Sequence, residues 1–404
     1  MKILVFTTVF PNEKQPTLGV FVRERMFKVA RHCEVKVVAP VPWFPFIELI
    51  RPGYRPKVPY LEIQDGIEVY HPRFFNIPGV CKFLDGFFLF LSSFWTVRSL
   101  RKIFGFDIID SHFIYPDAVG ACWLSRVFNR PLTVTLRESN PGKFIRSPLA
   151  KVQVLRALGR ATRVFSVCTA LKDYFQVLKI DPGKMHVVPN GVDIDKFRQA
   201  EKRTARRLLG LPESARILIT VGWLIERKGF DRVISLLPEL ATEIDSLYYV
   251  MVGAAPGDGT SYERRLRLLV QELKLENRVL FAGGQPHGEM YRWLCAADVF
   301  VLPTTGEGWA NVFLEAMACG LPVVTSRVGG NSEVVCSDDY GILFDLENAH
   351  DLLQAIRAAL TKTWDHEKIV AYAQENTWEK RVAALVGHFE TIMQAGGEEK
   401  NEYS

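Results

Sequence analysis

One stretch of the sequence is especially informative about the fold: LPTTGEGWANVFLEAMACGLP, residues 302–322. The apolar run Val299–Leu302 is typical of a buried strand, two glycines mark a loop, and a helix is predicted to begin near Asn311. Gly320 ends that helix, and a proline prevents its continuation. The stretch predicts a strand–loop–helix unit of a doubly wound parallel sheet, in which ligands bind beyond the carboxyl ends of the strands.

The same alternation of short apolar runs and longer amphipathic stretches fills most of the chain. The first half contains six such runs: Ile3–Thr7, Val35–Ala39, Asp107–Asp110, Thr133–Leu136, Val164–Val167 and His186–Val188. The second half also contains six: Ile217–Val221, Tyr248–Val252, Val279–Ala282, Val299–Leu302, Val323–Thr325 and Gly341–Phe344. Six strands suffice for one sheet, so the pattern predicts an α/β protein with two doubly wound domains, residues 1–193 and 194–375. The polar residues from Ala395 onward are expected to be frayed.

Composition excludes several classes of protein. The 404 residues are 48% hydrophobic and 24% charged, which is ordinary globular usage, and the net charge of +5 is too small to indicate nucleic-acid binding. Seven scattered cysteines without a CxxC pair are expected to be small buried residues in a reducing compartment. The first apolar run is better explained as a strand than as a signal peptide, and Phe83–Trp95 is too short to span a bilayer. These features predict a cytoplasmic protein.

The segment from Val41 to Trp95 interrupts the alternation with seven prolines, several aromatic residues and five basic ones. Prolines at this density exclude a regular helix before about position 80. One interpretation is an irregular insertion packed on the first domain. The other is an acceptor pocket or an interfacial surface for an anionic, lipid-linked substrate, at the cytoplasmic face of a membrane.

Polar groups gather where a ligand of the second domain would lie. The backbone amides of Ala310, Asn311 and Val312, at a predicted helix N-terminus, suit a phosphate. Glu315 lies one turn into the helix and suits a ribose diol, while Glu307 on the loop can reach the group beyond a diphosphate. Two solvated glutamates on a strand–loop–helix unit are the alternative. Neither carboxylate is expected to lie in the core.

Two adjacent cations, Arg227 and Lys228, follow the predicted strand Ile217–Val221. They lie on a loop whose Gly222 and Gly229 allow close approach of the backbone. Such a pair could neutralise a diphosphate leaving group as its charge develops. The alternative is a solvated basic turn.

These motifs together resemble those of the retaining glycosyltransferases of family 4, which have the GT-B fold. The resemblance is strong over residues 186–345 and rests on the Glu307-x7-Glu315 pattern and on three further motifs: Val328-Gly-Gly-Asn-Ser-Glu333, Pro189-Asn-Gly-Val-Asp193 and Val221-Gly-Trp-Leu-Ile-Glu-Arg-Lys-Gly229. It implies two Rossmann-like domains facing across a cleft, with the acceptor on the first and the nucleotide sugar on the second. It also implies that residues 376–404 form a helix crossing back to the first domain.

The resemblance implies sugar transfer with retention from a nucleoside-diphosphate sugar to the hydroxyl of a sugar or lipid-linked acceptor, without a cofactor. Glu307 would position the sugar, Glu315 the ribose, and Arg227 with Lys228 the diphosphate. Many members have an arginine after the glycine at Gly222, where this chain has tryptophan, so the two cations are expected to act together.

In the first domain the resemblance assigns a donor-sugar contact to His112, at the end of a predicted strand, and a donor-side loop to Gly19. The paired glycines common in the family are reduced here to one. Arg137-Glu138-Ser139 departs from the family pattern at the end of the next strand, and Glu138 is expected to bind the acceptor.

Metal binding is not expected. Asp193-Ile194-Asp195 has the DxD pattern that holds a divalent cation in other glycosyltransferases, but here it overlaps an interdomain turn of a metal-independent family. Two other functions stay open from the sequence: a nucleotide-sugar epimerase of GT-B fold, and a non-catalytic nucleotide-sugar-binding subunit.

Overall fold

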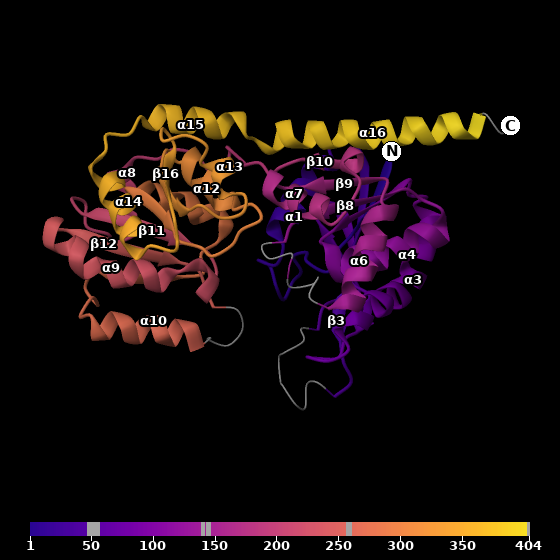
Figure 1. The fold of residues 1–404 in the computed structure, drawn as a ribbon, viewed down its shortest axis with the longest axis horizontal. Coiled ribbons are helices and arrows are strands. Elements are labelled where there is room, and N and C mark those ends of the chain that lie inside the picture. Colours follow the sequence, from indigo (N-terminus) through magenta and orange to yellow (C-terminus); the bar gives the residue numbers. More distant parts are fainter. Residues whose placement is uncertain (47–56, 139–141, 143–146, 256–260, 402–404) are drawn as a thin grey trace. The chain divides into compact units, whose positions relative to one another are not determined.

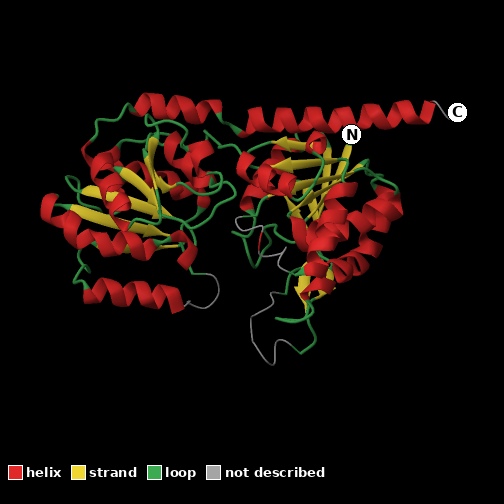
Figure 2. Cartoon of the chain, in the orientation of Figure 1, coloured by secondary structure: helices red, strands yellow, loops and turns green. Residues whose placement is uncertain are grey.

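The computed structural model describes residues 1–46, 57–138, 142, 147–255 and 261–401. The chain divides into two compact units, Met1–Asn190 with Trp378–Ser404 and Gly191–Thr377. Each unit is a mostly parallel sheet with helices against it, which confirms the predicted α/β fold with two Rossmann-like domains (Figures 1 and 2). The cleft between them stays a prediction.

The first unit contains an eight-stranded sheet in the order β10-β9-β8-β7-β1-β2-β5-β4. Its strands are β1 Lys2–Phe6, β2 Glu34–Val38, β4 Leu61–Gln64, β5 Ile67–Tyr70, β7 Ile108–His112, β8 Leu132–Leu136, β9 Arg163–Ser166 and β10 Met185–Val187. All pairs are parallel except β4–β5. The six runs predicted in this half form six of these strands.

The proline-rich segment is more ordered than the sequence indicates. It contributes β5 and the edge strand β4 to the large sheet, and it also forms a parallel pair of β3 (Val41–Trp43) and β6 (Arg73–Phe75). Pro59 and Pro72 fall outside the strands. Pro42 lies in β3 of a two-stranded sheet, in which each strand has one unpaired edge, so a residue without a backbone N–H is tolerated there. The number of prolines in the segment therefore did not predict its four strands, β3 to β6.

Helices cover the sheet of the first unit. They are α1 Val20–Val29, α3 Asp85–Ile103, α4 Val119–Phe128, α6 Pro148–Arg160, α7 Thr169–Val177 and α16 Trp378–Asn401, with short turns η1 Lys82–Leu84, η2 Ile114–Ala118 and η3 Pro182–Lys184. Buried residues of α16, including Leu385 and Phe389, join the core with β1 and β2. The helix runs on to Asn401, so the backbone is helical well past Ala395, where fraying was expected.

The second unit contains a six-stranded, fully parallel sheet in the order β13-β12-β11-β14-β15-β16. Its strands are β11 Arg216–Val221, β12 Leu247–Val252, β13 Val279–Gly283, β14 Val299–Leu302, β15 Val323–Ser326 and β16 Gly341–Phe344. They coincide with the six predicted runs. In order of sequence within the unit this is 3-2-1-4-5-6, the order of a dinucleotide-binding sheet.

The helices of the second unit pack through two buried clusters that share the strands of the sheet. They are α8 Lys202–Leu208, α9 Phe230–Glu243, α10 Ser261–Glu272, α11 Met290–Ala296, α12 Asn311–Ala318, α13 Asn331–Val334, α14 Ala349–Thr361 and α15 His366–Glu375, with turns η4 Glu226–Lys228 and η5 His287–Glu289. None of the helices in the described part of the chain is both long enough and apolar enough to cross a bilayer.

The seven cysteines, all among the described residues, are not in disulfides, and they are less uniformly buried than the sequence predicts. Cys33, Cys168, Cys295 and Cys319 are buried, and Cys122 is partly exposed. The prediction of burial is wrong for Cys81 and Cys336, which lie in exposed turns and not in the sheets or helices.

Candidate active site

Two loops of the second unit meet at the centre of its sheet. Strands β11 and β14 are neighbours, although they are first and fourth in sequence, and a doubly wound sheet binds ligands where its strand order reverses in this way. The loop after β11 carries Arg227, and the loop after β14 carries Glu307. The Thr305 N–H donates a hydrogen bond of 2.9 Å to the Arg227 carbonyl, which fixes one loop against the other.

Glu307 joins the two predicted cations. Its Oε1 lies 2.7 Å from Nη1 of Arg227 and 2.7 Å from Nζ of Lys228. The Thr304 hydroxyl donates a third hydrogen bond of 3.1 Å to the same oxygen. The family resemblance implies separate tasks for these residues, the sugar for the glutamate and the diphosphate for the cations, whereas in the structure they form one cluster. We call Arg227, Lys228, Thr304 and Glu307 the donor-loop cluster.

The carboxylate of this cluster is buried, whereas its two cations are partly exposed to solvent. Glu307 is 8% exposed, and the side chains of Arg227 and Lys228 are 31% and 14% exposed. The expectation that Glu307 lies outside the core is therefore wrong. The positive charges of Arg227 and Lys228 offset the desolvation cost of burying its carboxylate. Burial alone would raise the pKa of Glu307, but Lys228 and Arg227 hold that pKa below its ordinary value. The carboxylate is thus ionised.

Glycines make the close approach of these loops possible. Gly329 has φ +52°, and a Cβ there would lie 1.9 Å from the Glu307 carbonyl oxygen. Gly229 has φ +73°, and its Cβ would lie 2.3 Å from the Pro303 carbonyl oxygen. Gly222 is different, because a Cβ there would meet only the Lys228 side chain, at 3.4 Å. Close backbone contacts thus require glycine at positions 229 and 329, whereas the absence of a side chain at Gly222 leaves space beside the Lys228 side chain.

Helix α12 begins just beyond Glu307. No side chain caps its N-terminus at Ala310. Phosphate binding by the amides of Ala310, Asn311 and Val312 stays a prediction. Glu315 is one turn further on, with 16% of its side chain exposed and Oε1 3.6 Å from Nε2 of His287. Glu315 is therefore neither in the core nor fully solvated, and the partner histidine was not foreseen from the sequence.

The predicted site residues of the first unit lie deeper. His112, at the end of β7, is fully buried, and its Nδ1 accepts a hydrogen bond of 3.2 Å from Nε of Arg137. Its Nε2 lies 3.4 Å from Oδ2 of Asp110. Burial lowers the pKa of His112 to about 4, so the ring is neutral at neutral pH. As the ring lies here, it has no surface open to a ligand, and the predicted donor-sugar contact stays a prediction.

Glu138 and Gly19 have clear structural tasks. The Glu138 carboxylate is buried and accepts hydrogen bonds from the backbone N–H groups of Ile114 and Arg137, which fixes the turn after β7; burial raises its pKa. Gly19 precedes α1 with φ +68°, and a Cβ there would lie 2.3 Å from the Val9 carbonyl oxygen. Neither observation tests a substrate contact. Ser139, the third residue of that motif, lies outside the described residues.

The DxD sequence forms a turn. Oδ1 of Asp193 accepts hydrogen bonds from the N–H groups of Asp195, at 3.1 Å, and Lys196, at 3.2 Å. Its Oδ2 lies 3.7 Å from Nζ of Lys196. Among the residues that the structure describes, no three His, Cys, Asp or Glu side chains are grouped to hold a metal ion.

Comparison with known proteins identifies the family. Residues 201–376 match the model "Glycosyl transferases group 1", and residues 28–196 match "Glycosyltransferase Family 4". A D-inositol 3-phosphate glycosyltransferase of Stackebrandtia nassauensis is 30% identical over 72% of this chain and 69% of its own. The chain belongs to the family 4 glycosyltransferases. The putative teichuronic acid biosynthesis glycosyltransferase TuaC of Bacillus subtilis is 28% identical over 91% of this chain and 90% of its own.

A solved structure supports the same fold. Anabaena HepE, in complex with UDP, superposes with a TM-score of 0.74 at 20% sequence identity and covers 97% of this chain and 100% of its own. The two parallel sheets of this chain thus form the GT-B fold of a glycosyltransferase enzyme, with relatives in glycoconjugate synthesis.

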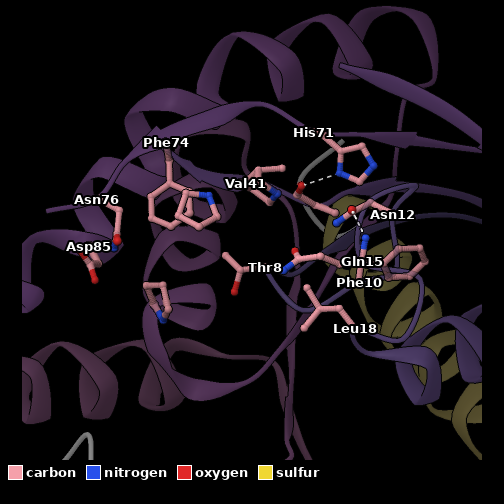
Figure 3. A pocket seen from close by; sticks show the side chains of 14 residues that line it. Thr8, Phe10, Asn12, Gln15, Leu18, Val41, His71, Phe74, Asn76 and Asp85 are labelled. Atoms are coloured by element: carbon pink, nitrogen blue, oxygen red, sulfur yellow. Dashed lines mark hydrogen bonds between the residues drawn. The ribbon is translucent and has the colours of Figure 1, made fainter. Parts of the chain in front are cut away.

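The first unit of this glycosyltransferase has a cavity of about 270 Å³ (Figure 3). The sequence suggested a pocket in the proline-rich segment but did not identify the residues that line it. It lies at the carboxyl ends of β1, β2 and β5 and takes one wall from the proline-rich segment. Fourteen residues line it, including the aromatic rings of Phe10 and Phe74 and the polar groups of Asn12, Gln15 and Asp85. None of the described residues that line it is a lysine or an arginine.

Proposed function

We propose that the protein is a retaining, metal-independent glycosyltransferase of hexosyltransferase type. It would transfer a sugar from a nucleoside-diphosphate sugar to a hydroxyl of a sugar or lipid-linked acceptor, in polysaccharide or other glycoconjugate synthesis. The observation that carries the proposal is the donor-loop cluster, in which a buried carboxylate holds two partly exposed cations at the point where the strand order reverses.

The donor would bind to the second unit. Arg227 and Lys228 present positive charge to the diphosphate, together with the amides at the N-terminus of α12. Glu315, on that helix, accepts the ribose hydroxyls. HepE crystallised with UDP supports a uridine nucleotide as the first donor to test.

Transfer would exploit charge that develops as the glycosidic bond breaks. The diphosphate gains negative charge, and cations already held at 2.7 Å by Glu307 need no reorganisation to stabilise it. The leaving diphosphate helps to deprotonate the acceptor hydroxyl on the same face of the sugar, which retains the anomeric configuration. The two fixed cations supply the charge that a metal ion supplies elsewhere.

The acceptor would bind to the first unit, in the cavity of Figure 3. Aromatic rings beside amide and carboxylate groups suit a sugar, whose C–H faces pack on rings and whose hydroxyls need hydrogen-bond partners.

A membrane contact would bring a lipid-linked acceptor within reach. Phe87, Leu91 and Trp95 follow one another at four-residue spacing on α3, and all three are exposed. Arg98 lies over the Trp95 ring at 5.3 Å. An apolar stripe with basic residues beside it suits the cytoplasmic face of an anionic membrane.

The test combines binding with product analysis. UDP-sugars are screened for thermal stabilisation, and the best donor is incubated with candidate acceptors while the product anomer is followed by NMR. We expect stabilisation, an acceptor-dependent release of UDP and a product with the donor's anomeric configuration. Product formed without an acceptor would indicate an epimerase, and inversion would overturn the retaining mechanism. Arg227→Met/Lys228→Met, compared with the exposed pair Arg203→Met/Arg207→Met, should abolish stabilisation by UDP.

A further inference from the structure

A groove lies between two helices of the first unit and shares no lining residue with the candidate acceptor cavity. Helices α4 and α6 line a cavity of about 550 Å³, and Figure 1 shows them beside α3. Its apolar lining includes Val119, Ala157 and the ring of Trp123, which is 47% exposed. Gly159 widens it, because a Cβ there would meet no atom within 4 Å. Such a groove could hold a hydrocarbon chain.

The groove has positive charge along its rim. Arg126, Arg156 and Arg160 line it and are exposed. Within the described part of the chain, none of the three makes an ion pair or a hydrogen bond. Helices α4 and α6 together contain these arginines and Lys151, and neither helix contains an aspartate or a glutamate. The chain as a whole is nearly balanced, with 50 basic and 45 acidic residues, so the charge is concentrated here.

Cys122 also lines the groove, and its thiol lies near this charge. Burial raises the pKa of Cys122, and the guanidinium groups of Arg160 and Arg126 oppose that rise. The arginines therefore lie close enough to the apolar lining for one ligand to contact both.

We propose that this groove binds an anionic membrane lipid, with the headgroup phosphate on the arginines and an acyl chain along the apolar lining. A soluble anion would not need the apolar groove, and a neutral apolar ligand would not need three arginines. Exposed Val127 and Val152 on the same helices would enter the membrane interface beside it. The site extends the membrane contact proposed for α3, but it does not depend on that contact or on sugar transfer.

Vesicle binding of the full chain tests the charge of the site. Flotation at low salt with phosphatidylglycerol–phosphatidylcholine vesicles is compared with pure phosphatidylcholine. We expect binding only to the anionic vesicles. Each arginine near such a surface contributes about 1 kcal/mol, which is about fivefold, so Arg156→Gln/Arg160→Gln should weaken binding about 25-fold. Arg203→Gln/Arg207→Gln, with the same charge change on exposed residues of α8, should weaken it less than about threefold.

A second measurement tests the acyl chain. Vesicles of phosphatidylglycerol brominated on the acyl chain quench tryptophan emission on contact. In a Trp95→Phe background, which removes the ring proposed to contact the membrane on α3, the quenching should be largely lost in Trp123→Phe. It should be kept in Trp223→Phe, which removes a ring of similar exposure (43%) from the second unit. If Trp95→Phe removes the quenching and Trp123→Phe does not, the membrane contacts α3 and the groove proposal is wrong. Equal weakening by the two arginine pairs, or no binding to anionic vesicles, would also overturn it. Donor binding by UDP, measured separately, should be unchanged in Arg156→Gln/Arg160→Gln and in Trp123→Phe, so failure of this proposal is distinguishable from failure of the proposed sugar transfer.

Discussion

Both units collect charged side chains at the carboxyl ends of central strands, but they bury them differently. In the donor-loop cluster, one buried carboxylate is matched by two cations whose side chains are 31% and 14% exposed. In the first unit, Asp110 and His112 are fully buried, and Arg25 beside them is 1% exposed. The first cluster can meet a charged ligand without moving, whereas the second holds the ends of β7 and β8 together.

This difference separates preorganised binding from structural support. A cation that already has a carboxylate partner and still faces solvent can add a phosphate at little cost of reorganisation. A neutral histidine held by Arg137 and Asp110 can contact a ligand only if one of those contacts opens. Substitutions in and around the donor-loop cluster should therefore act on catalysis and donor binding, whereas substitutions among the buried charged groups of the first unit should act on stability.

Glu307→Gln breaks the donor-loop cluster and should have the largest effect. We expect kcat to fall by about 10²–10³, as when one preorganised electrostatic contact is removed. The affinity for UDP should fall about tenfold as well, because Arg227 and Lys228 lose the charge that positions them, each such hydrogen bond contributing about 1.5–3 kcal/mol. The separate tasks assigned from the sequence would leave UDP affinity unchanged. Titration calorimetry of UDP into the variant decides between the coupled cluster and the separate tasks. Glu226→Gln, at an exposed glutamate of the loop that carries Arg227 and Lys228, is the control.

Glu315→Gln removes a carboxylate at the edge of the same site. Since ribose is bound equally in the ground and transition states, the donor KM should rise ten- to hundredfold and kcat should change little. Steady-state kinetics with the donor varied measures both constants. His287→Gln is the control for the 3.6 Å contact with Glu315. A fall in kcat without a change in KM would contradict the ribose assignment.

Asp117→Asn tests the first unit through its stability. Burial raises the pKa of Asp117 to about 7, against hydrogen bonds from the N–H and hydroxyl of Thr8. Because folding raises this pKa, the folded state binds the proton more tightly than the unfolded state does. The resulting contribution to the free energy of unfolding is complete below the unfolded pKa of about 4 and is lost as the pH rises through 7. The free energy of unfolding of Asp117→Asn relative to wild type should therefore increase between pH 4 and 7, by at most about 1.4 kcal/mol per pH unit. Urea unfolding at several pH values measures it, and a pH-independent difference would contradict the raised pKa.

Removal of divalent ions should have the smallest effect. Because fixed cations serve the diphosphate, excess EDTA should leave the rate of transfer within about twofold of its original value. Loss of activity that magnesium or manganese restores would instead give Asp193 and Asp195 a role in metal binding.

The sequence was informative where local chemistry decides the outcome. Apolar runs bounded by turns located every strand of the second sheet, and polar residues after strand ends located the loops that bear Glu307 and Arg227. It failed for β4 and β5, because prolines near strand ends resemble prolines that prevent a strand. It also missed Thr304, a threonine whose contact with Glu307 depends on how the loop folds.

The sequence by itself determined the alternation of strands and helices, the residues on each loop and the likeness to a family, because periodicity and turn chemistry act over a few residues. Only the tertiary structure decided that Glu307 is buried and held by cations 79 and 80 positions away in the chain. The physical reason is the strand order: pairing of β11 with β14 brings their loops together, and local sequence does not encode which strands become neighbours.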